Sequence, residues 1–481
     1  MTSIKKNIFY SSILTVSGYL FPLLTFPYIT RVLGVKNIGV CNFVDSIVQY
    51  FIYFSMMGMM TVGIREIARA KGDRKLLSKT FSELLSLNLL ATLIAVIILL
   101  ICTMCIPQMS EHKSMFFIGS AKILANTLLI EWLFKGIEDF KYITLRSVII
   151  RGLYVIAVFI FVRKAEDYQT YFLLTSLMVV VNAAVNIVYS RKFVSFTLRG
   201  VNMTPYVKPF LILGSYLLLT SMYTTFNVAY LGFVGDTTEV GYYTTATKLY
   251  LIIMSFFTAF TGVMMPRMSS LIAEGKIQDF RRLIDKSINA LLAFAFPLII
   301  IGEICAPQII RIIAGEGYEG AIFPMRIVMP LMAIIGYEEV IVLQVLSPMK
   351  KDTAILKNSF IGAIVGILLN ILIVPRYLSV GTSIVWVMSE CTVMLAAQYY
   401  VSKYIEYKMP VLSFIKRLLY SLPIVIVLFF INRRIESVWI SLIVVSGISL
   451  IYCVFIELYI LRNELIREYY LILINKIKQI L

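Results

Sequence analysis

The chain has little charge and almost no histidine. Only 15% of its 481 residues are charged, and His112 is the single histidine. A soluble protein of this length would need more charge to cover the surfaces of its domains, so a soluble fold is excluded. Any proton relay would have to use carboxylates, because the one histidine lies in a predicted external connection. Six cysteines lie in or beside apolar segments, which excludes a disulfide framework.

Long apolar runs occupy most of the sequence instead. Hydrophobic residues make up 59% of the chain, and its mean hydropathy is +0.87. Segments such as 89–101 are apolar on every side, which indicates helices and not the alternating strands of a membrane barrel. At about 20 apolar residues for each helical span, we predict an all-α polytopic integral membrane protein with about fourteen transmembrane helices. The expected spans lie near residues 9–30, 38–62, 84–106, 115–134, 146–162, 170–190, 210–233, 243–265, 288–306, 323–346, 358–375, 379–401, 413–431 and 437–461.

The lysines and arginines alternate with these spans. With fourteen spans, one side of the membrane receives 31 of the 44 basic residues and the other side receives 9. Short loops rich in lysine and arginine stay in the cytoplasm, so both termini are predicted to be cytoplasmic. A basic surface for nucleic acid would not alternate from loop to loop, so the net charge of +17 does not indicate a nucleic-acid partner.

Three short patterns recur about 200 residues apart and in the same order. Six predicted spans separate equivalent points, so both copies have the same orientation in the membrane. This arrangement predicts two pseudo-symmetric six-helix lobes with a cleft between them, as in alternating-access transporters. The matched patterns are Val32-Leu33-Gly34-x4-Gly39 with Leu231-Gly232-x8-Gly241, Gly63–Glu66 with Met265–Met268, and Cys105–Gln108 with Cys305–Gln308.

The repeat predicts the domain boundaries. We expect an N-terminal lobe over 1–195, a C-terminal lobe over 205–402, and two further transmembrane helices over 410–462. The remaining residues, 463–481, mix basic and apolar side chains and are expected to form a cytoplasmic tail. Such a tail can lie on the membrane surface as an amphipathic helix or remain solvated.

The stretch Trp132–Tyr142 resembles the W-x-F-x-G-x-E-D signature of Wzx-type polysaccharide flippases. Arg31–Gly34, Gly63–Glu66 and Val240–Ala246 also resemble patterns of that family, so the resemblance extends along the whole chain. The family shares a superfamily and a fold with multidrug antiporters of the MATE type and with lipid II flippases. The resemblance therefore implies a MATE-like fold in which spans 1, 2, 7 and 8 line the cleft.

What the resemblance implies for function is transport without catalysis. The expected substrate is an undecaprenyl-pyrophosphate-linked oligosaccharide, moved across the bacterial cytoplasmic membrane for capsule, O-antigen or exopolysaccharide synthesis. A polysaccharide polymerase, glycosyltransferases and membrane lipids are the expected partners. No cofactor is expected. Coupling to Na⁺ or H⁺ stays open, because Asn227 occupies the region of span 7 where relatives often carry an acidic residue.

Charged residues far from the ends of predicted spans are candidates for function, because a charge at the middle of a bilayer costs about 2.5–3.5 kcal/mol on insertion scales. Asp45 and Lys248 lie at nearly equivalent positions of the two copies of the repeat. One hypothesis is that Lys248 attracts the pyrophosphate and that Asp45 pairs with Lys248 when no substrate is present. The alternative is a fixed ion pair that sets how the lobes pack. The other deep charges are Lys122, Glu338, Glu339 and Glu390.

Polar side chains accompany these charges. Asn42 and Gln49 lie one helical turn before and after Asp45, so the three share a face. Span 7 adds Tyr223 and Asn227 at helical spacing, which suits contact with sugars but also ordinary packing. Five further charged residues lie within about two turns of a predicted end, where they are expected to reach the lipid headgroups. These five are Glu131, Arg151, Glu303, Arg326 and Glu457.

A drug antiporter and a membrane-bound sugar enzyme are the alternatives to a flippase. A MATE-type cation-coupled drug antiporter would depend on a buried carboxylate for its ion and its cationic substrate, and the deep lysines argue against such a substrate. A membrane-bound sugar polymerase or ligase would carry a large external loop, whereas every predicted external connection is short.

Overall fold

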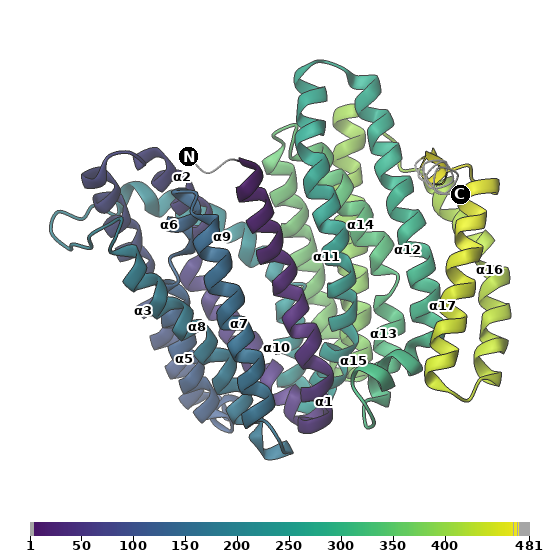
Figure 1. Cartoon of the computed structure of the whole chain (residues 1–481), viewed down its shortest axis with the longest axis horizontal. Helices are drawn as coiled ribbons and strands as arrows, with labels where there is room; N and C mark the ends of the chain where they lie inside the picture. Colours follow the sequence, from purple (N-terminus) through teal and green to yellow (C-terminus); the bar gives the residue numbers. More distant parts are fainter. Residues whose placement is uncertain (1–3, 465, 469, 471–481) are drawn as a thin grey trace, which may run out of the picture. The chain divides into compact units, whose positions relative to one another are not determined.

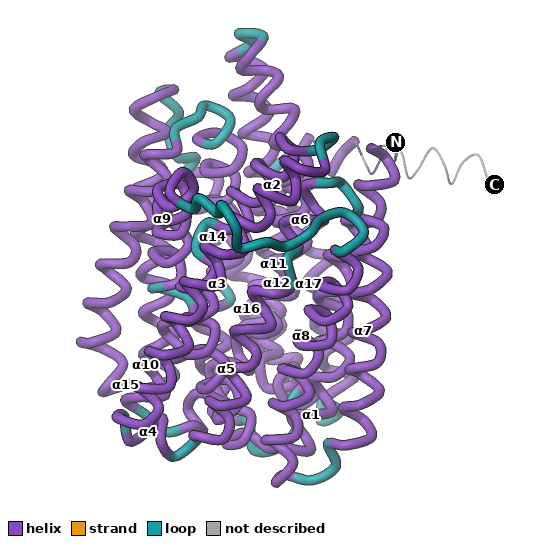
Figure 2. Tube along the Cα trace, turned by 90° about the vertical axis from the view of Figure 1, so that its left-hand side faces the viewer, coloured by secondary structure: helices purple, strands orange, loops and turns teal. Residues whose placement is uncertain are grey.

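The computed structural model describes residues 4–464, 466–468 and 470, and every regular element among them is helical (Figure 1; Figure 2). This confirms the all-α membrane fold. Most of the expected cytoplasmic tail, 471–481, lies outside the described residues. By compactness the chain divides into a first unit that ends at Gly241 and a second unit that begins at Tyr242.

The first unit is built around α1 (Ile4–Met56), which contacts α3, α5, α7, α8 and α10. Its helix pattern is interrupted at Gly34, where φ is 73°. Glycine adopts this left-handed value without a steric penalty, so the helix changes direction between the first two expected spans. The other helices of this unit are α2 (Met59–Ala70), α3 (Arg74–Cys105), α4 (Pro107–Ser110), α5 (Lys113–Leu128), α6 (Glu131–Gly136), α7 (Phe140–Phe161), α8 (Tyr168–Ser190), α9 (Thr204–Ser221) and α10 (Thr225–Val234).

The second unit contains most of α11 (Thr237–Ala273), which crosses the division between the units. Here α12 packs against α13, α14, α16 and α17, while α13 and α14 pack on α15. Leu378 interrupts α15 at φ 45°, between two expected spans. The remaining helices are α12 (Ile277–Ile313), α13 (Ile322–Val328), α14 (Leu331–Ile341), α15 (Asp352–Ile405), α16 (Val411–Arg434) and α17 (Val438–Phe455). Four short 3₁₀ or π turns complete the elements, of which η4 (Ile456–Ile460) continues α17.

Ten helices among the described residues are long and apolar enough to cross a membrane, or eleven if the bent pair α9–α10 forms one span. Two of the ten, the stretch Phe9–Ala70 and α15, each include a pair of expected spans on either side of a kink. The total of fourteen stays a prediction. The chain is nonetheless a multi-pass membrane protein by the length and composition of its helices.

The division between the units differs from the expected lobe boundary. Span 7 was expected to open the C-terminal lobe, but α9 and α10 contact α1, α2 and α3 of the first unit. Close packing explains this. A Cβ on Gly232 would lie 2.1 Å from the ring of Phe43, and one on Gly39 would lie 1.5 Å from the carbonyl oxygen of Thr237. The motif glycines therefore let α10 and the following turn approach the backbone of α1. The boundaries of the repeat itself stay a prediction.

Candidate functional site

The tryptophan signature forms a packed junction in the first unit. Trp132, Leu133 and Phe134 of α6 are all 0% exposed. A Cβ on Gly63 of α2 would lie 2.8 Å from the indole ring, and one on Gly136 would lie 2.6 Å from the side chain of Ile67. Both glycines therefore let α2 and α6 touch. The stretch around Gly63 and the tryptophan signature therefore pack against each other, which gives both a structural role.

The polar end of the signature ties this junction to α7 and α8. The Asp139 carboxylate caps α7 by accepting the backbone N–H of Tyr142 at 3.3 Å, and it also accepts the Tyr189 hydroxyl at 2.9 Å. Glu138 pairs with Lys71 at 2.8 Å, and the hydrogen bond and charge of this ammonium lower the pKa of Glu138. Both partners are exposed, so this bridge adds little stability.

A buried arginine stands behind the junction. Arg146 is 6% exposed and its guanidinium pairs with Glu131 at 2.9 Å. It also donates to the side-chain oxygen of Asn186, and the side-chain nitrogen of Asn186 donates to the backbone oxygen of Leu129. Glu131 was expected to reach the headgroups. It is instead held inside the unit by Arg146, because a buried guanidinium needs a carboxylate beside it.

The deepest charges of the first unit pair with each other. Lys122 of α5 donates to the Asp45 carboxylate on α1. The lysine side chain is 12% exposed and the aspartate side chain is 45% exposed. Lys122 also lies 5.9 Å from the centre of the Phe172 ring on α8, a distance that permits a cation–π contact. The sequence pointed to both charges but did not predict that they form an ion pair.

Tyrosines and a cysteine surround this Asp45–Lys122 pair. Tyr154 of α7 and Tyr171 of α8 are neighbours of each other and lie within the electrostatic reach of Asp45. Cys41, one turn before Asp45, is buried and donates to the backbone oxygen of Tyr168 at 3.4 Å. The result is a polar cluster within a bundle of apolar helices, with a half-exposed carboxylate as its accessible group.

The other expected binding residues are placed differently. Asn42 and Gln49 lie on α1 at half-buried positions, on either side of Asp45. Asn227 is 0% exposed and donates to the backbone oxygen of Tyr223 at 2.9 Å, while Tyr223 is 4% exposed. Neither therefore offers surface to a sugar in this conformation. Tyr223 lies in the 54° break between α9 and α10, and broken helices are typical of transporter binding sites.

Lys248 lies on α11 at a half-buried position in the second unit. Its expected ion pair with Asp45 stays a prediction. The side chain that the structure does place against Asp45 is Lys122. Because α1 and α5 are packed together in one unit, this pair can persist whatever the second unit does.

Three carboxyl groups gather in the second unit. Glu390 of α15 is 4% exposed and accepts the indole N–H of Trp386 at 3.0 Å. Glu338 of α14 lies close enough to Glu390 for the two carboxyl groups to interact electrostatically. Glu339 accepts the hydroxyl of Thr258 at 2.7 Å. Two neighbouring carboxyl groups in a low-dielectric interior are not expected to be ionised together, because their like charges repel. No set of three or more His, Cys, Asp or Glu side chains among the described residues is arranged to hold a metal ion.

Comparisons with known proteins agree with this geometry. Residues 4–272, more than half of the chain, match the family described as polysaccharide biosynthesis protein. The chain belongs to this family. Among curated relatives, a protein of Escherichia coli (strain K12), named as a proposed O-antigen transporter, is 26% identical over 81% of this chain and 95% of its own length. A Shigella dysenteriae protein of the same name is 24% identical over 81% of this chain and 98% of its own length.

Two solved structures share the fold of this family member. The lipid II flippase MurJ in an inward closed conformation matches 93% of this chain and 98% of its own, with a TM-score of 0.77 and 15% identity. An inward-facing multidrug resistance MATE transporter matches 80% of this chain and 94% of its own, with a TM-score of 0.60 and 14% identity. The resemblance read from the tryptophan signature is therefore confirmed, and so is the MATE-like fold.

Removing one member of the Asp45–Lys122 pair should destabilise the first unit, and removing both should restore much of the loss. Asp45→Asn or Lys122→Met leaves a charge without its partner. The cost should be below the roughly 3–5 kcal/mol of a fully buried pair, because Asp45 is half-exposed. Thermal unfolding of the detergent-purified single and double variants measures this coupling. The exposed pair Lys71–Glu138 is the matched control, and its variants should melt like the unaltered protein. Additive losses in the Asp45–Lys122 double variant would contradict the account.

Proposed function

We propose that the chain is a flippase that moves undecaprenyl-pyrophosphate-linked oligosaccharide units from the inner to the outer leaflet of the bacterial cytoplasmic membrane. The observation that carries the proposal is membership of a polysaccharide biosynthesis family by a chain made of membrane-spanning helices. Two further observations support this function: the relatives named as O-antigen transporters and the fold shared with a lipid II flippase.

The transport cycle we propose is alternating access between two six-helix lobes, with both termini in the cytoplasm. The pyrophosphate carries the negative charge of the substrate, and Lys122 and Lys248 would supply the positive charge. Asp45 pairs with Lys122 in the absence of substrate. When the pyrophosphate arrives, Lys122 exchanges this anionic partner for the phosphate, so its charge is never left unpaired. Asn42, Gln49, Tyr223 and Asn227 would serve the sugars and the rest of the headgroup once the lobes move. Glycosyltransferases would supply the substrate and a polymerase would consume it.

Deletion of the gene tests the function itself. We expect undecaprenyl-pyrophosphate-linked repeat units to accumulate on the inner leaflet and surface polysaccharide to disappear, because assembly continues while translocation stops. Extraction of lipid-linked sugars and immunoblots of surface polysaccharide measure both effects, and a plasmid copy should reverse them. Unchanged lipid-linked sugars together with altered drug resistance would instead favour a cation-coupled antiporter.

Lys248 is the residue whose charge the proposed cycle needs most directly. Loss of a hydrogen bond to a charged group costs about 1.5–3 kcal/mol, so Lys248→Ala should reduce surface polysaccharide by roughly tenfold or more. Lys248→Arg keeps the charge and should retain part of the activity. The assay is complementation of the deletion strain, with the amount of membrane-inserted protein measured in parallel. Full polysaccharide from the alanine variant at normal protein level would remove Lys248 from the mechanism.

We further propose that the flippase is coupled to protons through Glu338 and Glu390. We expect these two neighbouring carboxyls to hold one proton between them, and the groups that interact with them include Glu339, Tyr250, Trp386 and Cys391. A proton held between the two carboxyls would reduce the repulsion between them. Opening of the bundle to water would let the pair release it.

Reconstituted vesicles test this coupling. A pH gradient should accelerate translocation by the unaltered protein, and Glu390→Gln should abolish the acceleration because glutamine cannot exchange a proton. The matched control is Glu339→Gln, which alters a carboxyl bonded to threonine hydroxyls and should keep the response. A sodium gradient that drives transport in place of the pH gradient would overturn the proton assignment.

A further inference from the structure

A polar cavity of about 480 Å³ lies in the second unit, between the first turns of α12, the first turns of α16 and the segment that follows η4. Positive charge dominates its lining. The five basic side chains around it are Arg282, Lys286, Lys416, Arg417 and Arg462. They come from three separate parts of the chain, so the fold itself assembles this concentration of charge.

The carboxylates beside these bases do not balance all of them. Glu464 pairs with Lys286 at 3.0 Å and with Arg282 at 3.2 Å, and these two cations lower its pKa. Asp285 accepts the hydroxyl of Tyr407 at 2.5 Å. Within the part of the chain that the structure describes, Lys416 and Arg462 have no carboxylate within 4.0 Å. The cavity therefore keeps an excess of positive charge.

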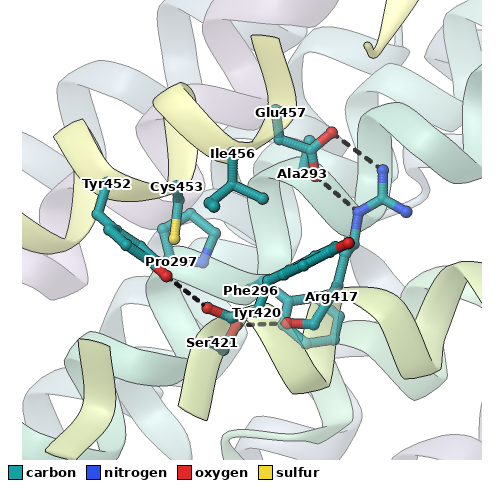
Figure 3. Close-up of a pocket in the computed structure, with 10 residues that line it drawn as sticks. All are labelled: Ala293, Phe296, Pro297, Arg417, Tyr420, Ser421, Tyr452, Cys453, Ile456 and Glu457. Atoms are coloured by element: carbon teal, nitrogen blue, oxygen red, sulfur yellow. Dashed lines mark hydrogen bonds and ion pairs between the residues drawn. The ribbon is translucent and has the colours of Figure 1, made fainter. Parts of the chain in front are cut away.

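Arg417, which lines the cavity, belongs to a buried ion pair with Glu457, and Figure 3 shows this pair where it borders a separate, neighbouring pocket. Arg417 of α16 binds both carboxylate oxygens of Glu457 at 2.6 and 3.0 Å, and the two side chains are 4% and 5% exposed. Asn463 donates to Glu457 at 2.9 Å and to the backbone oxygen of Asn289 at 3.2 Å. Glu457 was expected near the headgroups; the structure buries its side chain beside Arg417, and its depth in the membrane stays a prediction. The pair fixes the cavity walls and leaves Lys416 and Arg462 for a ligand.

Two features of α16 suit an anionic ligand on a lipid-facing helix. Leu412 and Ser413, in the first turn of this 24-residue helix, line the cavity, so the positive end of the helix dipole points toward it. Farther along α16, apolar side chains point outward, with Leu418 57% and Ile426 59% exposed. In a membrane protein such side chains face the hydrocarbon. A phosphate in the cavity would thus lie directly above acyl chains along α16.

The lysine and arginine distribution predicts which leaflet this is. The segments that supply most of the cavity bases, 267–287 and 402–417, belong to the side with the large excess of positive charge. That side is expected to be cytoplasmic. Basic pockets between helices at this face are typical binding sites for anionic lipid headgroups.

We propose that this cavity binds the phosphate headgroup of a resident anionic phospholipid of the inner leaflet. Lys416 and Arg462 contact the phosphate, and Arg417 positions them through its pairing with Glu457. The ligand is a bilayer lipid and not the transported substrate, because the cavity is built on α12, α16 and the segment that follows η4, outside the helices expected to line the cleft. The proposal does not depend on the flippase function.

Binding of defined lipids to the purified full-length protein tests it. Phosphatidylglycerol should raise the melting temperature and bind in native mass spectra, whereas phosphatidylcholine should do neither. At about 1 kcal/mol for each base near a lipid surface, the double variant Lys416→Gln with Arg462→Gln should bind phosphatidylglycerol about 30-fold more weakly. The matched control, Lys75→Gln with Lys79→Gln, removes two exposed bases of the first unit and should bind normally.

Each outcome decides the proposal. Equal melting of the unaltered protein and the Lys416 and Arg462 variant in phosphatidylcholine shows that the variant is folded. If phosphatidylglycerol then binds both equally, the cavity is not the lipid site and the proposal fails. If inorganic phosphate binds as tightly as the lipid, or if undecaprenyl pyrophosphate displaces phosphatidylglycerol from the cavity, the ligand is not a resident phospholipid and the proposal is also overturned.

Discussion

The cost of charge inside a hydrocarbon layer is the constraint on which the rest of this structure depends. Three ion pairs lower this cost by placing opposite charges together: Asp45 with Lys122, Glu131 with Arg146, and Glu457 with Arg417. Each pair joins helices of one unit, so each unit satisfies these charges by itself. None of these three pairs would have to break if the two units moved as rigid bodies. This property suits an alternating-access transporter.

The residues that identify the family and the residues proposed to bind substrate are different. Trp132 and Gly136 pack α6 onto α2, and Gly39 brings the turn before α11 close to α1. These positions tolerate no larger side chain, which is a sufficient physical reason for a recognisable pattern. The pattern identifies the fold and the family, while the residues we propose for substrate recognition are the polar cluster around Asp45 and Lys248. The sugar specificity is therefore expected to vary independently of the signature.

Sequence reasoning reached the helices because apolar runs of span length are strong signals, and it reached the family through the tryptophan signature. It placed Gly34 in a connection between two spans but did not predict that one helix continues through it with a kink. It did not reach the pairing of Asp45 with Lys122, since those residues are 77 positions apart and meet only through the packing of α1 on α5. Glu457 looked like a residue near a helix end, and Arg417 counted only as a loop charge. Their pairing needs the packing of α16 beside α17. Likewise, Asn227 and Tyr223 have the right spacing for a binding face, but burial is decided by neighbours that spacing does not show.

The central claim is that this membrane protein moves an anionic lipid-linked oligosaccharide. The most direct measurement is translocation by the purified protein in vesicles that carry labelled undecaprenyl-pyrophosphate-linked oligosaccharide in one leaflet. The account predicts that the label becomes accessible to an enzyme on the opposite side only when the protein is present. It also predicts that cationic drugs are not transported under the same conditions. Transport of cationic drugs without movement of the lipid-linked sugar would contradict the account.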